Sequence, residues 1–260
     1  MISLYEMTSS TEEMINALRV NALNHKNYKL YMPMDRALSF LLSGYLYLSI
    51  GEKWLDDEDH KQMENTSSYG RCFVCSTMEN IAFWQLYGGY KGENGAMLNF
   101  PGSIIKNLVK TESAELGKYE KNIFKAYKDI YSGKDFDSFM TDIVYTQDVK
   151  GKKGEDECRL SLWDEHKTVS KALVSDERIY KKNYIWQNEK ESRYIIQLKG
   201  EAATCAKDEK LGIIRVAISE KDKNQMKKNF YQSPLYCGKV DFGNQSNTYG
   251  KLNLKKEKEE

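Results

Sequence analysis

The segment Trp186 to Tyr194 carries charged side chains at alternate positions, between an aromatic residue and an apolar run. Glu189, Glu191 and Arg193 follow one another at a spacing of two residues. Side chains of an extended strand alternate between two faces, so this spacing predicts that all three groups project to the same side. Two carboxylates this close repel each other unless a cation or a ligand compensates them. The pattern therefore predicts a strand whose charged face has a partner or a function.

The composition is that of a globular protein with a substantial core. Of the 260 residues, 40% are hydrophobic and 12% aromatic, and 39 basic side chains balance 38 acidic ones. A net charge near zero argues against a general binder of polyanions. No apolar run is long enough to predict a membrane span, and the N-terminus lacks the pattern of a signal peptide. We therefore expect a cytoplasmic protein of one large domain or two small ones.

The five cysteines are widely spread, which favours a reducing compartment over a disulfide framework. Cys72 and Cys75 have the C-x-x-C spacing of metal and redox sites. No second pair and no suitably spaced histidine accompanies them, so we expect ordinary core cysteines and no metal. The acidic run from Asp56 to Asp59 is a weaker metal candidate, and such runs are usually solvated loops.

Periodicity predicts an α+β chain in which short strands and amphipathic helices follow one another. The helices are expected at residues 10–24, 35–42, 78–87 and 220–230. The strands are expected at residues 28–32, 45–49, 71–76, 95–100, 178–186, 191–198, 211–219 and 234–242. The stretch 103–178 is rich in Lys, Asp and Tyr and gives mixed helical signals. The simplest layout is a single catalytic-type domain over 1–250, with a mainly helical insertion at about 103–178 and a charged tail at 251–260.

Four blocks of sequence follow one another in a set order. They are an opening Leu-Tyr strand with a helix and a strand ending in Ser, then Cys-Phe-x-x-Ser, then Asn-x-x-x-Trp-x-x-Tyr with a Lys-Gly strand, then Trp-x-x-Glu-Lys-Glu-x-Arg. They stand at residues 30–49, 72–76, 80–100 and 186–193. These blocks resemble an uncharacterised bacterial domain family found among toxin and phage-defence proteins. The resemblance covers residues 28–100 and 179–198, and the last block is its most specific part.

The order of the blocks also resembles the ADP-ribosyltransferase superfamily, whose members use NAD. The resemblance implies a single ADP-ribosyltransferase-like domain, with a mixed central β-sheet and flanking helices. In that superfamily a late strand supplies the catalytic glutamate, often within Glu-x-Glu. Carried over by position, Glu191 is the catalytic carboxylate, and Glu189 orients the nucleophile.

The same resemblance implies a set of NAD-binding residues. A Ser motif at Ser76 frames the nicotinamide, an aromatic side chain from the third block stacks on it, and Arg193 binds the pyrophosphate. The chain departs from the superfamily at the first strand, which normally supplies a His or Arg to the ribose. The implied NAD-binding residues are Tyr28, Tyr31, Ser49, Ser76, Trp84, Tyr87 and Arg193.

Cleavage of the nicotinamide–ribose bond passes through a cation that a nearby carboxylate stabilises. We therefore expect a mono-ADP-ribosyltransferase, a toxin or defence effector, that modifies a protein or nucleic acid and has an antitoxin or other neutralising partner. The alternatives are an NAD glycohydrolase, a non-catalytic interaction or sensing domain of the same fold, and a nuclease. The nuclease would need the acidic run Asp56 to Asp59 to converge with Glu189 or Glu191.

Each candidate residue also has a structural interpretation. Charged runs such as Glu189 to Arg193 are common on solvated edge strands, and Arg193 is suited to neutralising one of the glutamates. Trp84 and Tyr87 are spaced as neighbours on a helix face, which is typical of core packing. Ser76 has the position of a helix cap, with Glu79 completing a capping box.

Overall fold

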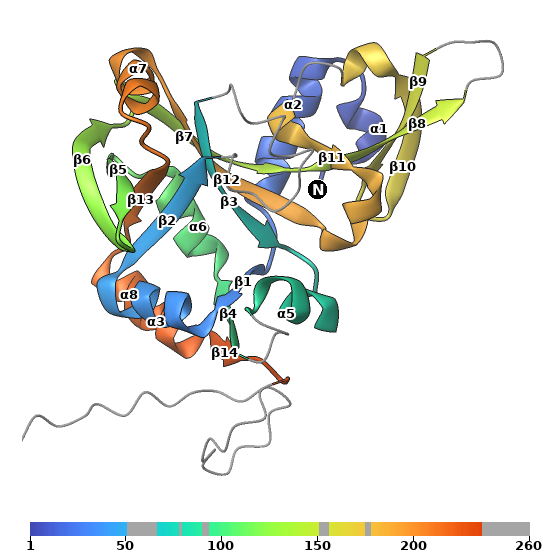
Figure 1. Cartoon of the computed structure of the whole chain (residues 1–260). Coiled ribbons are helices and arrows are strands. Elements are labelled where there is room, and N and C mark those ends of the chain that lie inside the picture. The colour runs from blue at the N-terminus through green and yellow to red at the C-terminus, as the bar shows by residue number, and fades with distance from the viewer. Residues whose placement is uncertain (51–66, 78–79, 90–93, 151–155, 175–177, 236–260) are drawn as a thin grey trace, which may run out of the picture. The chain divides into compact units, whose positions relative to one another are not determined.

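The computed structural model describes residues 1–50, 67–77, 80–89, 94–150, 156–174 and 178–235 (Figure 1). The chain divides into two compact units, which are described separately. The first unit comprises Met1–Tyr28, Leu46–Ser76 and Pro101–Ala217. The second unit comprises Lys29–Tyr45, Thr77–Phe100 and the described residues from Ile218 onward.

The first unit is organised around strand β12 (Glu191–Leu198), which lies between β3 (Ser68–Val74) and β7 (Phe136–Asp142). Both neighbours run antiparallel to β12. Seven of its eight residues are buried, because Tyr194, Ile195 and Ile196 pack on both faces of the sheet. The strand predicted at 191–198 is therefore confirmed, and it is a central strand with no free edge in this region.

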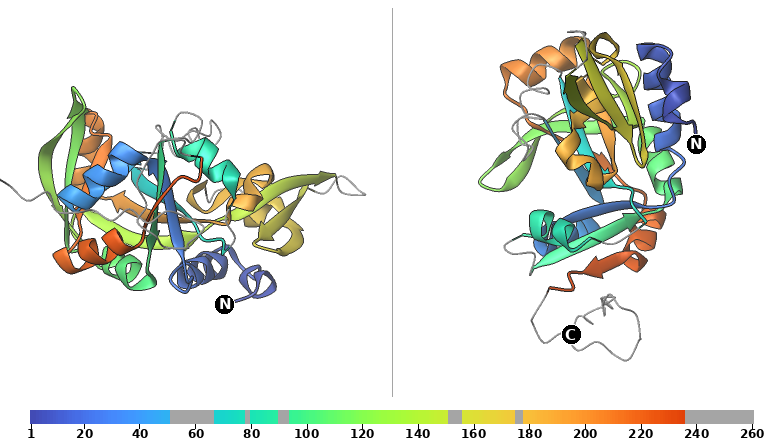
Figure 2. Two further views of the ribbon diagram at one scale, coloured as in Figure 1. Left: turned by 90° about the horizontal axis from the view of Figure 1, so that it is seen from below. Right: turned by 90° about the vertical axis from the view of Figure 1, so that its right-hand side faces the viewer.

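Three further strands extend the sheet of the first unit beyond β2 (Tyr45–Ile50), which pairs with β3. They are β13 (Ile213–Ala217), β5 (Ser113–Glu120) and β6 (Ile123–Tyr131), and each is antiparallel to the next. The β5–β6 pair forms a long hairpin (Figure 2). Helix α7 (Gly200–Asp208) connects β12 to β13 along the chain.

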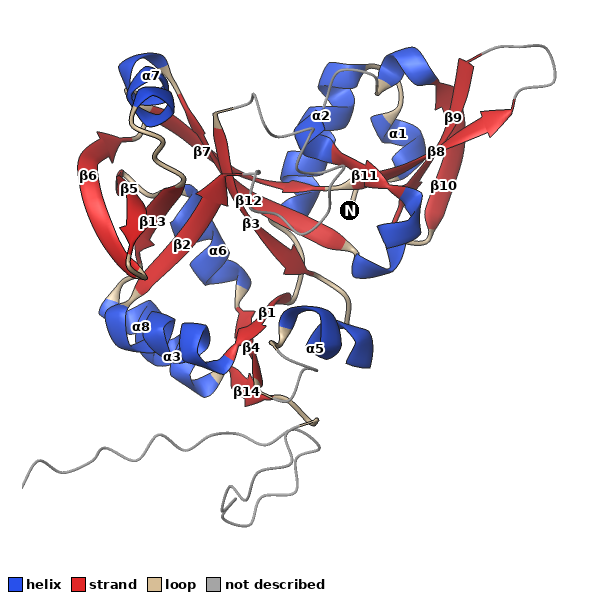
Figure 3. Ribbon diagram, viewed as in Figure 1, coloured by secondary structure: helices blue, strands red, loops and turns tan. Residues whose placement is uncertain are grey.

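A second, smaller sheet has the order β10-β9-β8-β11 (Figure 3). Strands β8 (Val144–Lys150), β9 (Asp156–Leu162) and β10 (Glu165–Ser170) are antiparallel, and the short β11 (Lys181–Asn183) is parallel to β8. Helices α1 (Leu4–Met7) and α2 (Thr11–Ala22) lie side by side and share a hydrophobic core with this sheet. Ser10 caps α2, as expected, by accepting a hydrogen bond from the backbone of Glu13.

The prediction of a mainly helical insertion at 103–178 is wrong. After α6 (Gly102–Val109), the described residues of this stretch form strands β5 to β10 and the short 3-10 helix η3 (Lys171–Leu173). The apolar positions of β5, such as Ala114 and Leu116, alternate with exposed or half-buried ones, as a one-sided strand requires. The Lys, Asp and Tyr residues that suggested helices occupy the solvent-facing positions of these strands.

The second unit contains β1 (Tyr28–Pro33), β4 (Gly95–Phe100) and β14 (Phe230–Gln232), with β4 between the other two. Its helices are α3 (Met34–Ser43), α5 (Ile81–Tyr87) and α8 (Glu220–Lys228). Gly44 ends α3 in the left-handed conformation, as its position predicts, and its N–H donates to Phe40 at 2.8 Å. The last strand lies at 230–232, ahead of the predicted 234–242, and most of that predicted range lies outside the described residues.

These elements confirm an α+β fold with a mostly antiparallel sheet. Within the described part of the chain, no helix is both long and apolar enough to cross a membrane. The charged tail at 251–260 and the acidic run Asp56 to Asp59 lie outside the described residues. A single domain over 1–250 stays a prediction.

Gly117 offers a test of the β5–β6 hairpin. A Cβ atom at this position would lie 2.1 Å from the carbonyl oxygen of Lys125 and 2.8 Å from the ring of Phe124. We expect Gly117→Ala to lower the free energy of unfolding by roughly 2–3 kcal/mol, because the backbone of β6 must move. Gly102→Ala is the control, since its Cβ would meet ordinary contacts at 3.6 Å. Equal stability of the two variants in urea denaturation would contradict this packing.

Candidate active site at the start of strand β12

The charged segment is only partly a strand. A 3-10 helix, η5 (Tyr184–Glu189), ends at Glu189, and Lys190 then adopts the left-handed conformation with φ of 45° before β12 begins at Glu191. The prediction that Glu189 shares a strand face with Glu191 and Arg193 is therefore wrong. Asn183 explains the helical turn, because its side chain caps η5 by accepting a hydrogen bond from the backbone of Ile185. Glu191 and Arg193 do share a strand face, as expected.

Four charged side chains meet at this strand start, and we call them the charge cluster: Lys182, Glu189, Glu191 and Arg193. The ammonium of Lys182 donates to Oε2 of Glu189 at 2.7 Å and to Oε2 of Glu191 at 3.1 Å. Nε of Arg193 donates to Oε1 of Glu191 at 2.5 Å. Each of the four residues is at most 7% exposed. Two buried carboxylates are thus matched by two buried cations.

Neighbouring groups fix the charge cluster in place. The backbone N–H of Glu191 donates to the hydroxyl of Tyr145 on β8 at 2.9 Å. The guanidinium of Arg193 donates to the carbonyl oxygen of Ile179, in the 3-10 helix η4 (Arg178–Tyr180), at 3.3 Å. The ring centroid of Trp186 lies 5.1 Å from the ammonium of Lys182, within the range of a cation–π contact.

The surroundings of Glu191 hold its side chain in the ionised state. Burial by itself raises the pKa of this carboxyl, but the charges of Arg193 and Lys182 oppose it, as do hydrogen bonds from Arg193 and Cys72. The net effect lowers the pKa well below the ordinary value of 4.5. Burial, with the charge of Glu191 second, raises the pKa of the Cys72 thiol. Glu191 is therefore a permanent carboxylate, and Cys72 stays a protonated donor.

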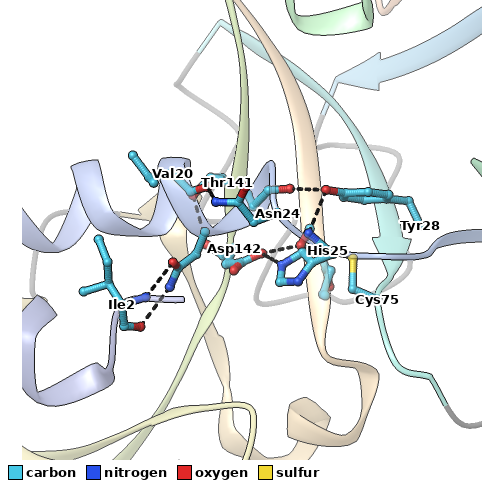
Figure 4. Close-up of polar contacts among 12 residues, drawn as sticks. Ile2, Val20, Asn24, His25, Tyr28, Cys75, Thr141 and Asp142 are labelled. Carbon is cyan, nitrogen blue, oxygen red and sulfur yellow. Dashed lines mark hydrogen bonds and ion pairs between the residues drawn. The ribbon is translucent and has the colours of Figure 1, made fainter. Parts of the chain in front are cut away.

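The opposite face of the same strand carries a second set of buried polar groups, His25, Cys75, Asp142 and Ser192, which we call the polar chain (Figure 4). Nε2 of His25 lies 2.7 Å from Oδ1 of Asp142. The hydroxyl of Ser192 donates to that same oxygen, and the thiol of Cys75 donates to Ser192 at 3.3 Å. The polar chain joins β7, β12 and the residue after β3 to the loop after α2.

Asp142 is the most constrained member of the polar chain. Burial raises the pKa of its carboxyl above the ordinary value of 3.8, while hydrogen bonds from His25 and Ser192 and the charge of His25 oppose that rise. Its second oxygen, Oδ2, is buried and has no hydrogen-bond partner within the described residues. The sequence gave no sign of this contact, because His25 and Asp142 are separated by 117 positions.

Ser76 and Ser49 belong to the same unit as the charge cluster. Val74 on β3 pairs with Glu191, and the backbone of Cys75 donates to the carbonyl oxygen of Lys190 at 3.0 Å, so Ser76 lies just beyond the paired strand ends. Ser76 is half-buried. It does not cap α5, because Asn80 does so by accepting from the backbone of Ala82; Glu79 lies outside the described residues.

Ser49 lies opposite Gly70 on β3, four positions along that strand from the partner of Glu191. Tyr28 is fully buried in the first unit. Its hydroxyl donates to the carbonyl oxygen of Ala22 at 2.7 Å and accepts from the backbone of His25 at 3.2 Å. The hydroxyl of Tyr28 is therefore engaged in the local fold.

The remaining predicted residues, Tyr31, Trp84 and Tyr87, belong to the second unit. The rings of Tyr31 and Trp84 meet edge to face at 5.1 Å, and Trp84 is fully buried. Tyr87 ends α5 and is half-buried. Of the two aromatic candidates in this helix, Tyr87 is the one with ring surface exposed within its own unit.

No three metal-ligating side chains converge anywhere in the described part of the chain. Cys72, Cys75, Cys158 and Cys205 are free thiols, as expected for core cysteines. The acidic run required by the nuclease alternative lies outside the described residues.

Comparisons with protein-family models, curated proteins and solved structures find no match to this chain. The interpretation of the site therefore depends on its own geometry.

The charge cluster predicts strong coupling between its members. We expect Arg193→Met to lower the free energy of unfolding by about 3–5 kcal/mol, because it leaves Glu191 with one buried cation in place of two. Adding Glu191→Gln removes the uncompensated charge, so the double variant should be less destabilised than the sum of the single variants. Urea denaturation of the four proteins measures the coupling. Additive losses would contradict a direct Glu191–Arg193 interaction.

The polar chain predicts a dependence of stability on pH. Because the folded-state pKa of Asp142 is raised, its contribution is present below the ordinary carboxyl value and is lost as the pH rises through the folded-state pKa. Between about pH 4 and pH 7, wild type should lose on the order of 1 kcal/mol relative to Asp142→Asn. Asp129→Asn, at an exposed strand position, is the control and should track wild type. A constant difference between wild type and Asp142→Asn would refute this prediction.

Proposed function

We propose that the start of β12 is the catalytic centre of an NAD-dependent mono-ADP-ribosyltransferase, with Glu191 as the catalytic carboxylate. The observation that carries the proposal is the ionised state of Glu191, which Arg193 and Lys182 maintain in a buried position. A second support is the pairing of β12 with β3, which brings the Ser76 end of one strand beside the Glu191 end of the other. These are the two strand motifs that the resemblance connects with NAD.

The reaction requires a fixed negative charge. The bond between the nicotinamide nitrogen and C1′ of the ribose breaks, and its electron pair leaves with the nicotinamide. Positive charge develops on C1′ and the ring oxygen, and a preorganised carboxylate stabilises it more strongly in a dry site than in water. The acceptor nucleophile then bonds to C1′ and loses its proton. In this scheme Glu191 stabilises the cation and binds the 2′-hydroxyl, while Glu189 orients the acceptor.

The proposal also assigns the surrounding residues. Ser76 frames the nicotinamide and Tyr87 stacks on it, since Trp84 is fully enclosed by its own unit. Arg193 holds the carboxylate of Glu191 and is therefore a positioning residue; its guanidinium is too deeply buried to be the first choice for pyrophosphate. Tyr28, Tyr31 and Ser49 complete the proposed nucleotide-binding set.

The wider role follows the resemblance as a proposal. The protein acts as a cytoplasmic toxin or defence effector on a protein or nucleic-acid acceptor, under the control of an antitoxin or another neutralising partner. Hydrolysis of NAD without an acceptor uses the same residues, with water as the nucleophile.

A second candidate function is a non-catalytic interaction or sensing domain. It is favoured by one observation: both carboxylate oxygens of Glu191 already have cationic partners, and the residue is only 4% exposed. In this case the charge cluster is a structural element that fixes the start of β12.

Glu191→Gln distinguishes the two functions. If Glu191 is catalytic, the substitution should reduce transfer of labelled ADP-ribose, or release of nicotinamide, by about 100-fold or more, because the neutral amide cannot balance the developing cation. Glu115→Gln is the matched control: Glu115 forms a paired carboxylate with Arg215 on the β5–β13 pair, and its loss should leave turnover unchanged.

Stability is measured on the same samples. Undiminished turnover in a folded Glu191→Gln protein would refute the catalytic assignment. Absence of any NAD turnover by wild type, with cell extract supplied as acceptor, would favour the interaction domain.

A further inference from the structure

We infer that the ammonium of Lys182 occupies a binding subsite for an organic cation, formed by Glu189, Glu191 and Trp186, and that a nicotinamide-type ring cation takes this place when Lys182 moves out. The inference rests on the proposed function for the identity of the ligand. The subsite itself is defined by contacts within the first unit.

The geometry around the Lys182 ammonium is that of a bound cation. Two carboxylate oxygens approach it, at 2.7 Å from Glu189 and 3.1 Å from Glu191. The indole ring of Trp186 lies at 5.1 Å. Carboxylates together with an aromatic face are the features with which proteins recognise organic cations, including quaternary nitrogen. The positively charged pyridinium ring of NAD belongs to this class.

The charge balance of the cluster leaves one cation position open to exchange. With Lys182 withdrawn, two buried carboxylates face a single cation, Arg193, and their repulsion favours the entry of a replacement. A neutral ligand would leave that net charge uncompensated. The subsite therefore selects for cations, and a ring with a fixed positive charge satisfies it at any pH.

Lys182 is better suited to leave than Arg193. Arg193 belongs to the central strand β12, is fully buried and also donates to the backbone at Ile179. Lys182 belongs to the three-residue strand β11, which lies between the 3-10 helices η4 and η5. Its charge is carried on a flexible four-carbon stem, so the ammonium can move without rearrangement of the sheet. Trp186 beside it is half-buried, which places the subsite close to solvent.

In this arrangement Lys182 is an internal competitor for the ligand. It neutralises Glu191 in the free protein, and a cationic ligand must displace it to contact the carboxylate. Removal of Lys182 should therefore tighten binding of the cation, which is the opposite of what the loss of a ligand-contacting residue would do.

The test uses 1-methylnicotinamide, a permanent ring cation without a nucleotide, and isothermal titration calorimetry. We expect Lys182→Ala to bind it at least about tenfold more tightly than wild type does, because the competitor is gone and the carboxylates remain. Uncharged nicotinamide is the control ligand and should gain nothing. Adding Glu189→Gln to Lys182→Ala should abolish the gain. Equal binding by wild type and a folded Lys182→Ala protein would overturn the inference.

Wild type provides an independent test if Lys182→Ala does not fold. Acetylation of Lys182 by a lysine-selective reagent, followed by mass spectrometry, should be at least about fivefold faster with saturating 1-methylnicotinamide, since the displaced ammonium is exposed. Labelling of Lys190, which pairs with the exposed Asp164, is the internal control and should not change. An unchanged rate at Lys182 would overturn the inference.

The inference and the proposed function can fail separately. Tight binding of the cation together with full transfer activity in Glu191→Gln would retain the subsite and refute the catalytic role. Loss of transfer in Glu191→Gln without any binding gain in Lys182→Ala would retain the catalytic role and refute the subsite.

Discussion

The pairing of the Glu191 carboxylate with Arg193 and Lys182 is the interaction on which the start of β12 depends. A carboxylate in the interior is strongly unfavourable without compensating charge, and here two cations and a backbone contact to Tyr145 supply it. The partners come from separate segments, so the charge balance also fixes where β11 and η5 lie against β12. Replacement of one member leaves a buried charge and affects the whole region.

Both faces of this strand start are polar, although the rest of β12 is apolar. One face carries the charge cluster, and the other carries Ser192, whose hydroxyl links Asp142 to Cys75. Farther along, Ile195 and Ile196 fill the core. Buried polar groups cost stability unless all of them are satisfied, and Oδ2 of Asp142 lacks a partner within the described residues. Such a concentration of polar groups is typical of functional sites, which is why the catalytic proposal is centred here.

The sequence predicted those elements whose signals are local. The strand at Gly95–Phe100, the Gly44 helix end and the Ser10 cap follow from one or a few neighbouring residues, and the structure has them. Long-range contacts were not predictable: the partners of Glu191 and Asp142 depend on how distant segments meet. The stretch 103–178 was predicted wrongly because Lys and Tyr on the outer faces of its strands obscured a two-residue apolar period.

The most direct test of this account is the carboxyl carbon resonance of Glu191, followed by NMR with selective ¹³C labelling. The account predicts that this resonance does not titrate between about pH 3 and pH 8, because Arg193 and Lys182 keep the group ionised, and that it shifts when NAD is added. A resonance that titrates near the ordinary glutamate value of 4.5, or one that NAD leaves unchanged while other signals move, would contradict the central claim.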